Sequence, residues 1–299
     1  MDHAPVAFSA SFSASINICG ENWLNASSRP ASIGQRAASE LVDRRTLNSL
    51  LENAQPRDKQ RLRRLDHKHA NAWITALPSN TDGRDTIMGP KIFCTAVARL
   101  LGLPVYSNSN PCPLCQQPLD LLGDHALCCK KTQDTITRHN RVRNWLFKLG
   151  ELGGLHPQLE KLGLLGPTDS SKRRPGDVSF ELWRYGRGLA IDVAVICPLA
   201  PSHLQQEHPC ELYAERQKHA RYDAGFKGSR FDFAAVVFET SGAVNSEGND
   251  LIKQLIRFAS RRECVGNSSF AGRAWARIGC CIQTSVAQAI LNRDYSDVS

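Results

Sequence analysis

The stretch DVSFELWRYGRGLAIDVAVICPL, residues 177–199, decides the fold. Its first part alternates apolar and polar residues, RYGRG offers a turn, and LAIDVAV is an apolar run rich in β-branched residues. This pattern predicts a half-buried strand joined, by a tight hairpin through Gly186–Gly188, to a strand buried on both faces. Asp192 interrupts the second strand, and a carboxylate there must be paired, protonated or bound to a metal.

The flanking segments extend this hairpin into a mixed domain. Upstream, residues 134–152 carry apolar side chains at helical spacing, and Gly153–Gly154 end the helix. Downstream, residues 211–226 read as a helix and residues 231–242 as another strand. With a short strand near residues 156–165, the expected order is α-β-β-β-α-β. We therefore predict an α+β domain over residues 132–295.

Three acidic residues fall on or beside the predicted strands: Glu160, Asp177 and Asp192. The hairpin would bring Asp177 alongside Asp192, and two carboxylates converging at a sheet edge suit a hard cation such as Mg²⁺. Taken alone, an aspartate in this position is more often a turn or cap residue, and only its combination with Asp192 favours a metal ligand. We expect the acids and a nearby cation to converge within roughly 10 Å, since carboxylates farther apart could not share one metal ion.

The helix over residues 211–226 offers that cation. Glu211, Glu215, Lys218 and Tyr222 are spaced by four, three and four residues, which predicts one shared face. Lys218 could stabilise developing charge on a phosphate or position the attacking water. The plainer alternative is a solvated helix with a Glu215–Lys218 ion pair.

A cysteine-rich segment precedes this domain: PCPLCQQPLDLLGDHALCCKK, residues 111–131. Cys112, Cys115, His125 and either Cys128 or Cys129 could complete a tetrahedral zinc site. Four protein ligands leave no open position, so the zinc would be structural. The alternative is a set of free buried thiols beside an unrelated histidine. Spacing alone does not choose between Cys128 and Cys129.

The chain has 299 residues, a net charge of +8 and 11 cysteines. Residues 1–40 are rich in small polar residues and predict a disordered leader. Residues 41–108 predict a helical, basic region, which is either a solvated face or a nucleic-acid contact. No long apolar run predicts a membrane span, and no secretory signal is evident, so we expect a reducing compartment.

The order of the motifs resembles a known family. After the cysteine knot come RHN (138–140), RPGDV (174–178) and AIDV (190–193), with AWITALPS (72–79) and RLLGLP (99–104) upstream and CPLAPSHL (197–204), KHARYD (218–223) and VVFETSG (236–242) downstream. Together they resemble the carboxy-terminal region of non-LTR retrotransposon polyproteins, which carries a CCHC zinc knuckle and a restriction-like endonuclease of the PD-(D/E)XK superfamily. The likeness covers roughly residues 70–295, and each motif is short, so the signal lies in their order.

The resemblance implies specific roles. It assigns residues 109–131 to the knuckle and selects Cys129 as the last zinc ligand. It matches Glu160, Asp177 and Asp192 to the acids of the nuclease core, with Asp177 and Asp192 as ligands of a catalytic Mg²⁺. Ala194 stands where the superfamily has a lysine, so Lys218 is expected to substitute, with Arg221 in reserve. The following basic residues are expected to contact phosphates: Arg138, Arg141, Arg143, Lys172, Arg173 and Arg174.

These features predict a Mg²⁺-dependent DNA endonuclease with a structural zinc site, acting in the nucleus. DNA is the expected partner, and retroelement RNA is a further candidate. A chain of 299 residues has no room for a reverse transcriptase beside these motifs, so we expect the detached end of a longer element. The alternative is a catalytically inactive nucleic-acid-binding remnant or domesticated domain, which Ala194 favours and the retained acids oppose.

Overall fold

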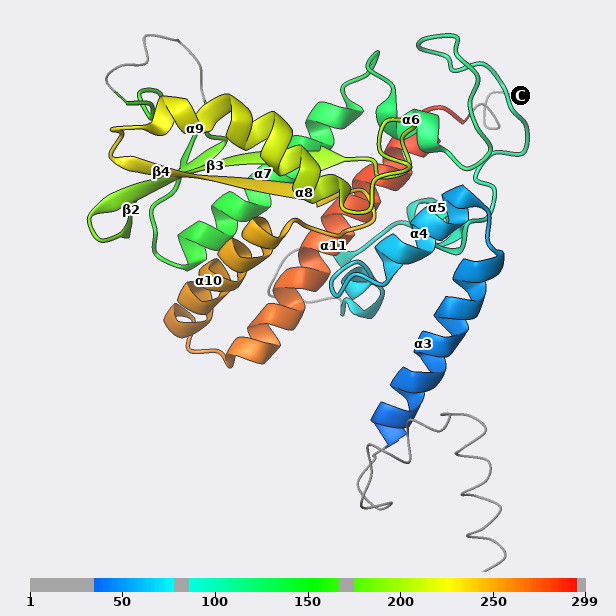
Figure 1. The fold of residues 1–299 in the computed structure, drawn as a ribbon, viewed down its shortest axis with the longest axis horizontal. Coiled ribbons are helices and arrows are strands. Elements are labelled where there is room, and N and C mark those ends of the chain that lie inside the picture. The colour runs from blue at the N-terminus through cyan, green and yellow to red at the C-terminus, as the bar shows by residue number, and fades with distance from the viewer. Residues whose placement is uncertain (1–34, 78–85, 167–174, 295–299) are drawn as a thin grey trace, which may run out of the picture. The chain divides into compact units, whose positions relative to one another are not determined.

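The structure is a computed structural model that describes residues 35–77, 86–166 and 175–294 (Figure 1). The chain forms two units, residues 1–62 and 63–299. The first holds helix α3 (Gln35–Asn53) and most of helix α4 (Pro56–Leu65). Helix α3 begins inside the predicted disordered leader, so that prediction is wrong from Gln35 onward, and the rest of the leader lies outside the described residues.

The second unit contains one mixed sheet with the strand order β1-β2-β3-β4. Its strands are β1 (Gln158–Leu159), β2 (Val178–Arg184), β3 (Arg187–Ile196) and β4 (Phe231–Glu239). The pairs β1–β2 and β2–β3 are antiparallel, whereas β3–β4 is parallel. The central strand β3 is buried along nearly its whole length, which explains its unbroken apolar sequence.

The predicted hairpin between β2 and β3 is confirmed. Arg184 pairs with Arg187, so the turn consists of Tyr185 and Gly186. Both residues have positive φ angles, 50° and 75°, as a type I′ turn requires. This turn matches the twist of the two strands and fixes their register.

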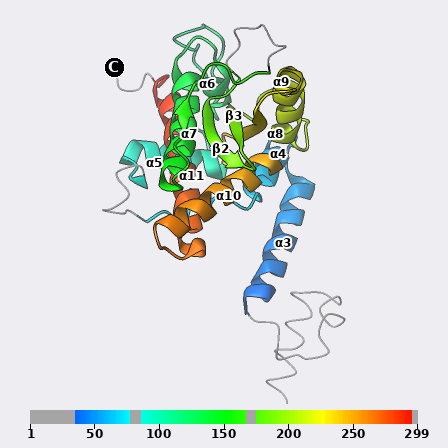
Figure 2. The ribbon, with the colours of Figure 1, turned by 90° about the vertical axis from the view of Figure 1, so that its left-hand side faces the viewer.

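Helices cover both faces of the sheet (Figure 2). On one side lie α7 (Asp134–Leu152), α10 (Ser246–Arg262) and α11 (Asn267–Leu291), packed on Ile191 and Val193 of β3. On the other side lies a continuous helical segment made of α8 (Pro209–Tyr213), the π-helical η3 (Ala214–His219) and α9 (Ala220–Phe226). Ala194 and Ile196 pack against that segment. Asp192 therefore projects toward the segment, because alternate strand residues share one face.

The observed order, α7-β1-β2-β3-(α8–η3–α9)-β4, agrees with the predicted α-β-β-β-α-β order. The mixed α+β architecture is thus confirmed, although β1 has only two residues. Helix α7 also packs as its pattern predicts, since Val142, Trp145, Leu146 and Leu149 are all buried.

Side chains from the start of α10 cover the open edge of β4. The Asn245 side chain accepts a hydrogen bond from the Val237 amide at 2.9 Å and donates one to the Ala235 carbonyl at 3.0 Å. The Glu247 carboxylate accepts one from the Ala235 amide at 2.9 Å. An exposed edge would otherwise invite another strand. These bonds also anchor the start of α10 against the sheet.

The second unit also has three short or medium helical elements among its described residues: η1 (Ala72–Thr75), α5 (Pro90–Leu101) and α6 (Asp124–Cys128). Residues of the knuckle, including Leu119 and Leu127, belong to the same hydrophobic core as α7, α11 and the sheet. The Tyr106 hydroxyl adds a buried bond to the Ile290 carbonyl of α11 at 2.9 Å. The knuckle is thus packed into the sheet unit. Among the described helices, none is long and apolar enough to cross a membrane.

Candidate functional site

Four side chains of the knuckle form a group suited to a metal ion. The ligand atoms of Cys112, Cys115, His125 and Cys129 all lie within 4.8 Å of one another. The Cys115 Sγ to His125 Nε2 distance is 3.2 Å. Three sulfurs and one imidazole are the donors of a closed structural zinc site, so this group could bind a metal such as zinc.

Asp120 holds the knuckle in this shape. Its carboxylate accepts hydrogen bonds from the amides of Leu122, Asp124 and His125 at 3.1, 3.0 and 2.7 Å. These bonds satisfy amides at the start of α6 that have no partner within the helix. Arg99 then pairs with Asp124 at 2.8 Å. The network orients α6 and with it His125.

The two adjacent cysteines have different environments. Cys129 is buried within the metal-ligand group, whereas Cys128 lies outside it and contacts Cys197. The hydrogen bond from Cys128, together with Arg99, lowers the pKa of Cys197 to about 6 despite burial. The geometry therefore selects Cys129 as the fourth ligand, as the family resemblance implies.

Asp177 and Asp192 come together across the β2–β3 pair. Val178 is paired with Ile191, so extending the antiparallel register by one residue sets Asp177 opposite Asp192. Directly opposed residues have Cβ atoms about 4.5–5.5 Å apart. The Asp177 carboxylate also accepts a hydrogen bond from the Val193 amide at 2.6 Å. The predicted juxtaposition of the two aspartates is therefore present.

Lys218 reaches this pair from the π-helical segment η3. Its Nζ forms an ion pair with Asp192 Oδ2 and lies 3.4 Å from the Val193 carbonyl oxygen. The prediction that Glu215 and Lys218 share a face assumed an α-helical spacing, but residues 214–219 are π-helical, and Glu215 is exposed whereas Lys218 is partly buried. A π turn contains about one residue more than an α turn, which shifts the facing of residues across it. Lys218 forms its ion pair with Asp192, instead of with Glu215 as the alternative predicted.

Helix α7 supplies two further contacts to the acids. His139 Nε2 lies 3.1 Å from Asp177 Oδ1, and Arg143 Nη1 lies 2.6 Å from Glu160 Oε1. His139 and Arg143 are four residues apart and share one face of α7. The Glu160 amide also donates to the Asp177 carbonyl at 3.1 Å. Glu160 thus sits beside Asp177 through its backbone, while its half-exposed side chain points to Arg143.

The charges in this cluster shift one another's pKa values. Burial raises the pKa of Asp192, and Asp177 adds to the rise, although Lys218 opposes it. Burial would also raise the pKa of Asp177, but hydrogen bonds from His139 and the Val193 amide lower it below its usual value. The Asp192 carboxylate keeps the pKa of Lys218 raised against burial. Lys218 is therefore a charged ammonium at neutral pH.

A second histidine lies beside Lys218. His219 Nδ1 is 2.9 Å from Asp223 Oδ1, and His219 Nε2 is 2.9 Å from Glu247 Oε2. Burial opposes the effect, but the two carboxylates raise the pKa of His219. Because Glu247 also holds the edge of β4, His219 ties the π segment to the sheet.

The residues predicted to contact phosphates differ in how accessible they are. Arg138 is 2% exposed and donates to the Leu127 carbonyl at 3.2 Å, so its burial under the knuckle removes it from any surface that a phosphate could reach. Arg141 is exposed and donates to the Ser285 hydroxyl at 2.9 Å. Arg143 is engaged with Glu160. Lys172, Arg173 and Arg174 lie outside the described residues.

The two sites differ as metal candidates. Within the described parts of the chain, the knuckle is the one set of three or more His, Cys, Asp or Glu side chains placed to hold an ion. Glu160, Asp177 and Asp192 do not form such a set, and the Glu160 side chain pairs with Arg143.

The residues that sequence reasoning left without a role are His139 and His219. In the sequence, His139 belongs to the RHN motif, and its spacing of four residues from Arg143 is the pattern that indicates a shared helix face. His219 follows Lys218 directly, and nothing local in the sequence predicts its two carboxylate partners. Comparison of the chain with protein-family models, curated proteins and solved structures gave no match.

Proposed function

We propose that this chain carries a Mg²⁺-dependent DNA endonuclease domain of the PD-(D/E)XK type, similar to the nuclease of non-LTR retrotransposons. The observation that carries the proposal is the position of Asp177 opposite Asp192, with the Lys218 ammonium bound to Asp192. The strand order around this pair is the one expected of such a core. The family motifs and the placement of these three residues support the same function.

The two aspartates would offer oxygen ligands to a hard divalent cation. Asp192 is buried and Asp177 is partly buried. Burial, and then the negative charge of Asp177, raise the pKa of Asp192, and oxygen ligands are those that Mg²⁺ prefers. Asp177 and Asp192 would hold the ion, and Glu160 lies one backbone hydrogen bond away. When bound, Mg²⁺ would supply electrostatic stabilisation of the phosphate and a more acidic attacking water.

The protein's own residues would perform the remaining work. Because the raised pKa keeps Lys218 protonated, it would stabilise negative charge that develops on the phosphate and would not act as a base. His139 would hold the Asp177 carboxylate in a fixed orientation. His219 would keep the π segment, and so Lys218, in register with the sheet. Zinc at the knuckle would stabilise the fold beside α7 and α11.

Nicking of supercoiled plasmid tests the proposal. The full chain should nick plasmid when Mg²⁺ is present. It should not nick plasmid when EDTA is added shortly before the assay. Asp177→Asn and Asp192→Asn should each lose at least about 100-fold in rate, as expected when a charge that binds the catalytic ion is removed. Asp250→Asn is the matched control, since Asp250 is exposed on α10 and pairs with Lys253. Equal activity in all four proteins would reject the catalytic assignment.

Two specific features favour a second function. Glu160 faces Arg143 instead of the two aspartates, and Ala194 occupies the usual lysine position. These features suit a nucleic-acid-binding remnant that keeps the fold without cleavage. Such a protein would bind DNA with a steep salt dependence and would nick no plasmid with Mg²⁺ or Mn²⁺. The same plasmid assay therefore separates the two functions.

A further inference from the structure

A basic groove lies between helices α7 and α11. Arg141, Trp145 and Lys148 share one face of α7, at spacings of four and three residues. His139 precedes Arg141 by two residues, about 200° around the helix, so the groove lies on the flank of α7 away from His139 and Asp177. From α11 come Phe270, Arg273 and Arg277.

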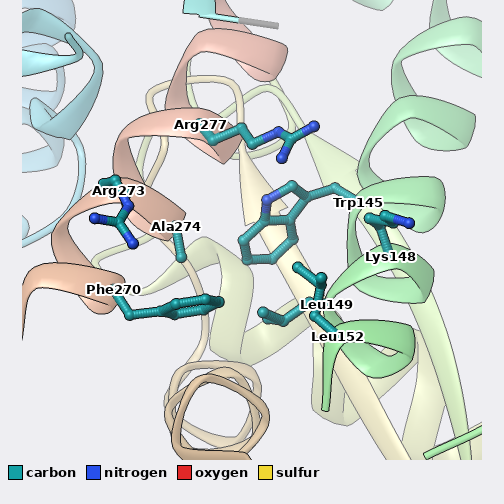
Figure 3. A pocket seen from close by; sticks show the side chains of 8 residues that line it. All are labelled: Trp145, Lys148, Leu149, Leu152, Phe270, Arg273, Ala274 and Arg277. Atoms are coloured by element: carbon teal, nitrogen blue, oxygen red, sulfur yellow. The ribbon is translucent and has the colours of Figure 1, made fainter. Parts of the chain in front are cut away.

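The groove consists of two adjoining hollows that share Trp145, Lys148 and Arg277. The larger hollow has a volume of about 450 Å³. Figure 3 shows the smaller one, where the rings of Trp145 and Phe270 border the same space and the guanidinium groups of Arg273 and Arg277 lie at its rim.

The described lining of the groove is basic. Among the lining residues that the structure describes, four are cations and none is acidic. Lys148 also forms an ion pair with Glu151 at 3.2 Å. The Arg273 guanidinium lies 6.0 Å from the Phe270 ring centroid. A cationic donor and a partly exposed aromatic ring are thus set side by side.

We propose that this groove binds a segment of single-stranded DNA. Arg273, Arg277 and Lys148 would contact phosphates, and a base would stack on Phe270, which is the combination used by proteins that bind single strands. The larger hollow, which Lys148 and Arg277 line but Phe270 does not, has a volume in the range of roughly 300–1,000 Å³ typical of pockets for small ligands, so it suits a nucleotide next to the one stacked on Phe270 and is too small for a duplex. Strand binding itself requires no cleavage.

The choice of DNA over RNA rests on the proposed nuclease function. Helix α7 contributes His139 and Arg143 to the acid cluster on one flank and Arg141, Trp145 and Lys148 to the groove on the other. A strand separated from its partner at the cleavage site would meet the groove on crossing α7. The groove would then hold the displaced strand away from the acids.

Binding of a fluorescein-labelled oligothymidine to the full chain, followed by anisotropy without Mg²⁺, tests this proposal. Arg273→Gln/Arg277→Gln should weaken binding at least 10-fold and make the slope of log affinity against log salt less negative by about 1.4, or about 0.7 per phosphate contact. Arg257→Gln/Arg261→Gln on α10 is the matched control, with the same charge change and the same spacing. It should change affinity by less than about 3-fold. If both double variants lose affinity equally, the effect comes only from the lower net charge, and the proposal is overturned.

Two substitutions at Phe270 test the stacking contact. Phe270→Leu should weaken binding about 10-fold, whereas Phe270→Trp should retain it, because base stacking on an aromatic ring contributes about 1–3 kcal/mol per base. Thermal unfolding of each variant checks that the fold is kept. Equal binding by Phe270→Leu and wild type would contradict the proposal.

Further binding measurements distinguish a failure of this proposal from a failure of the nuclease function. If a DNA duplex binds as tightly as oligothymidine, the assignment to single strands is overturned. If oligouridine binds more tightly than oligothymidine, the choice of DNA over RNA is overturned. Asp177→Asn should bind oligothymidine like wild type. If the wild-type chain binds through the groove but nicks no plasmid, the nuclease function fails while the groove proposal stands.

Discussion

The cysteine–histidine knuckle and the acid cluster are both built from a few polar side chains, yet they are assembled in opposite ways. The knuckle ligands lie between Cys112 and Cys129, and their donor atoms face one another without opposite charges between them. The acid cluster draws on α7, β3 and the π segment, from His139 to Lys218, and each of its acids already has a partner. The knuckle is therefore expected to need its ion for stability, whereas the acid cluster is stable through its own charge pairs.

Loss of zinc should have the largest effect. Cys115→Ser should abolish zinc binding and lower the free energy of unfolding by about 5 kcal/mol. This is less than the ~10–16 kcal/mol that structural zinc provides to zinc-finger peptides, because the knuckle also shares the hydrophobic core. Zinc content by atomic emission and unfolding in urea measure both effects. Cys128→Ser is the control and should retain one zinc per chain, since Cys128 lies outside the ligand group.

Removal of one partner from the buried ion pair should come next. Lys218→Met leaves the Asp192 carboxylate, whose side chain is 8% exposed, without its cation and should cost about 3–5 kcal/mol. Lys218→Met/Asp192→Asn should recover most of that loss, because no unpaired charge remains. Urea unfolding of the wild type and the single and double variants gives the coupling energy. A double variant no more stable than Lys218→Met would show that the pair is not what stabilises the cluster.

His139→Ala should have a smaller, pH-dependent effect. His139 helps to lower the pKa of Asp177, so its contribution is present above pH ~3.8 and is lost as pH falls through the folded-state pKa. We expect a loss of about 1.5 kcal/mol at pH 6 that diminishes toward pH 3. Urea unfolding over this range measures it, with His203→Ala as a control. A difference independent of pH would contradict the assigned role.

His219→Gln should show the weakest effect and the opposite pH dependence. The two carboxylates raise the pKa of His219, so its contribution is full below pH ~6.5 and is lost as pH rises through the raised pKa. Because the imidazole is partly exposed and screened, the loss should be at most about 1 kcal/mol at pH 5.5 and close to zero at pH 9. Paired unfolding curves at the two pH values test the sign.

Sequence reasoning succeeded where the relevant contacts are local. The hairpin, the buried face of α7 and the cysteine spacing each depend on neighbouring residues, and all three are present in the structure. Asp177 and Asp192 could be placed together because one tight turn connects their strands.

Contacts between distant segments were harder to foresee. Arg138 is buried because the knuckle packs on α7, and the sequence alone does not show that packing. The Glu160 side chain turns toward Arg143, 17 residues earlier on a separate helix. The exposed position of Glu215 follows from the π turn, which a fixed helical period does not predict.

The π segment also determines which genetic changes this protein can accept. Helix 209–226 is fixed at its start by the hydrogen bond that the Ser246 amide donates to the Glu211 carboxylate, and at its end by the burial of Phe226. The additional residue of the π turn lies between these two points. Substitutions at exposed Arg216 or Gln217 would leave the turn intact, whereas deletion of a single codon there would rotate Lys218 and His219 by about 100° relative to Glu211. In this helix, the number of residues between Glu211 and Phe226 is under stronger constraint than the identity of those exposed in between.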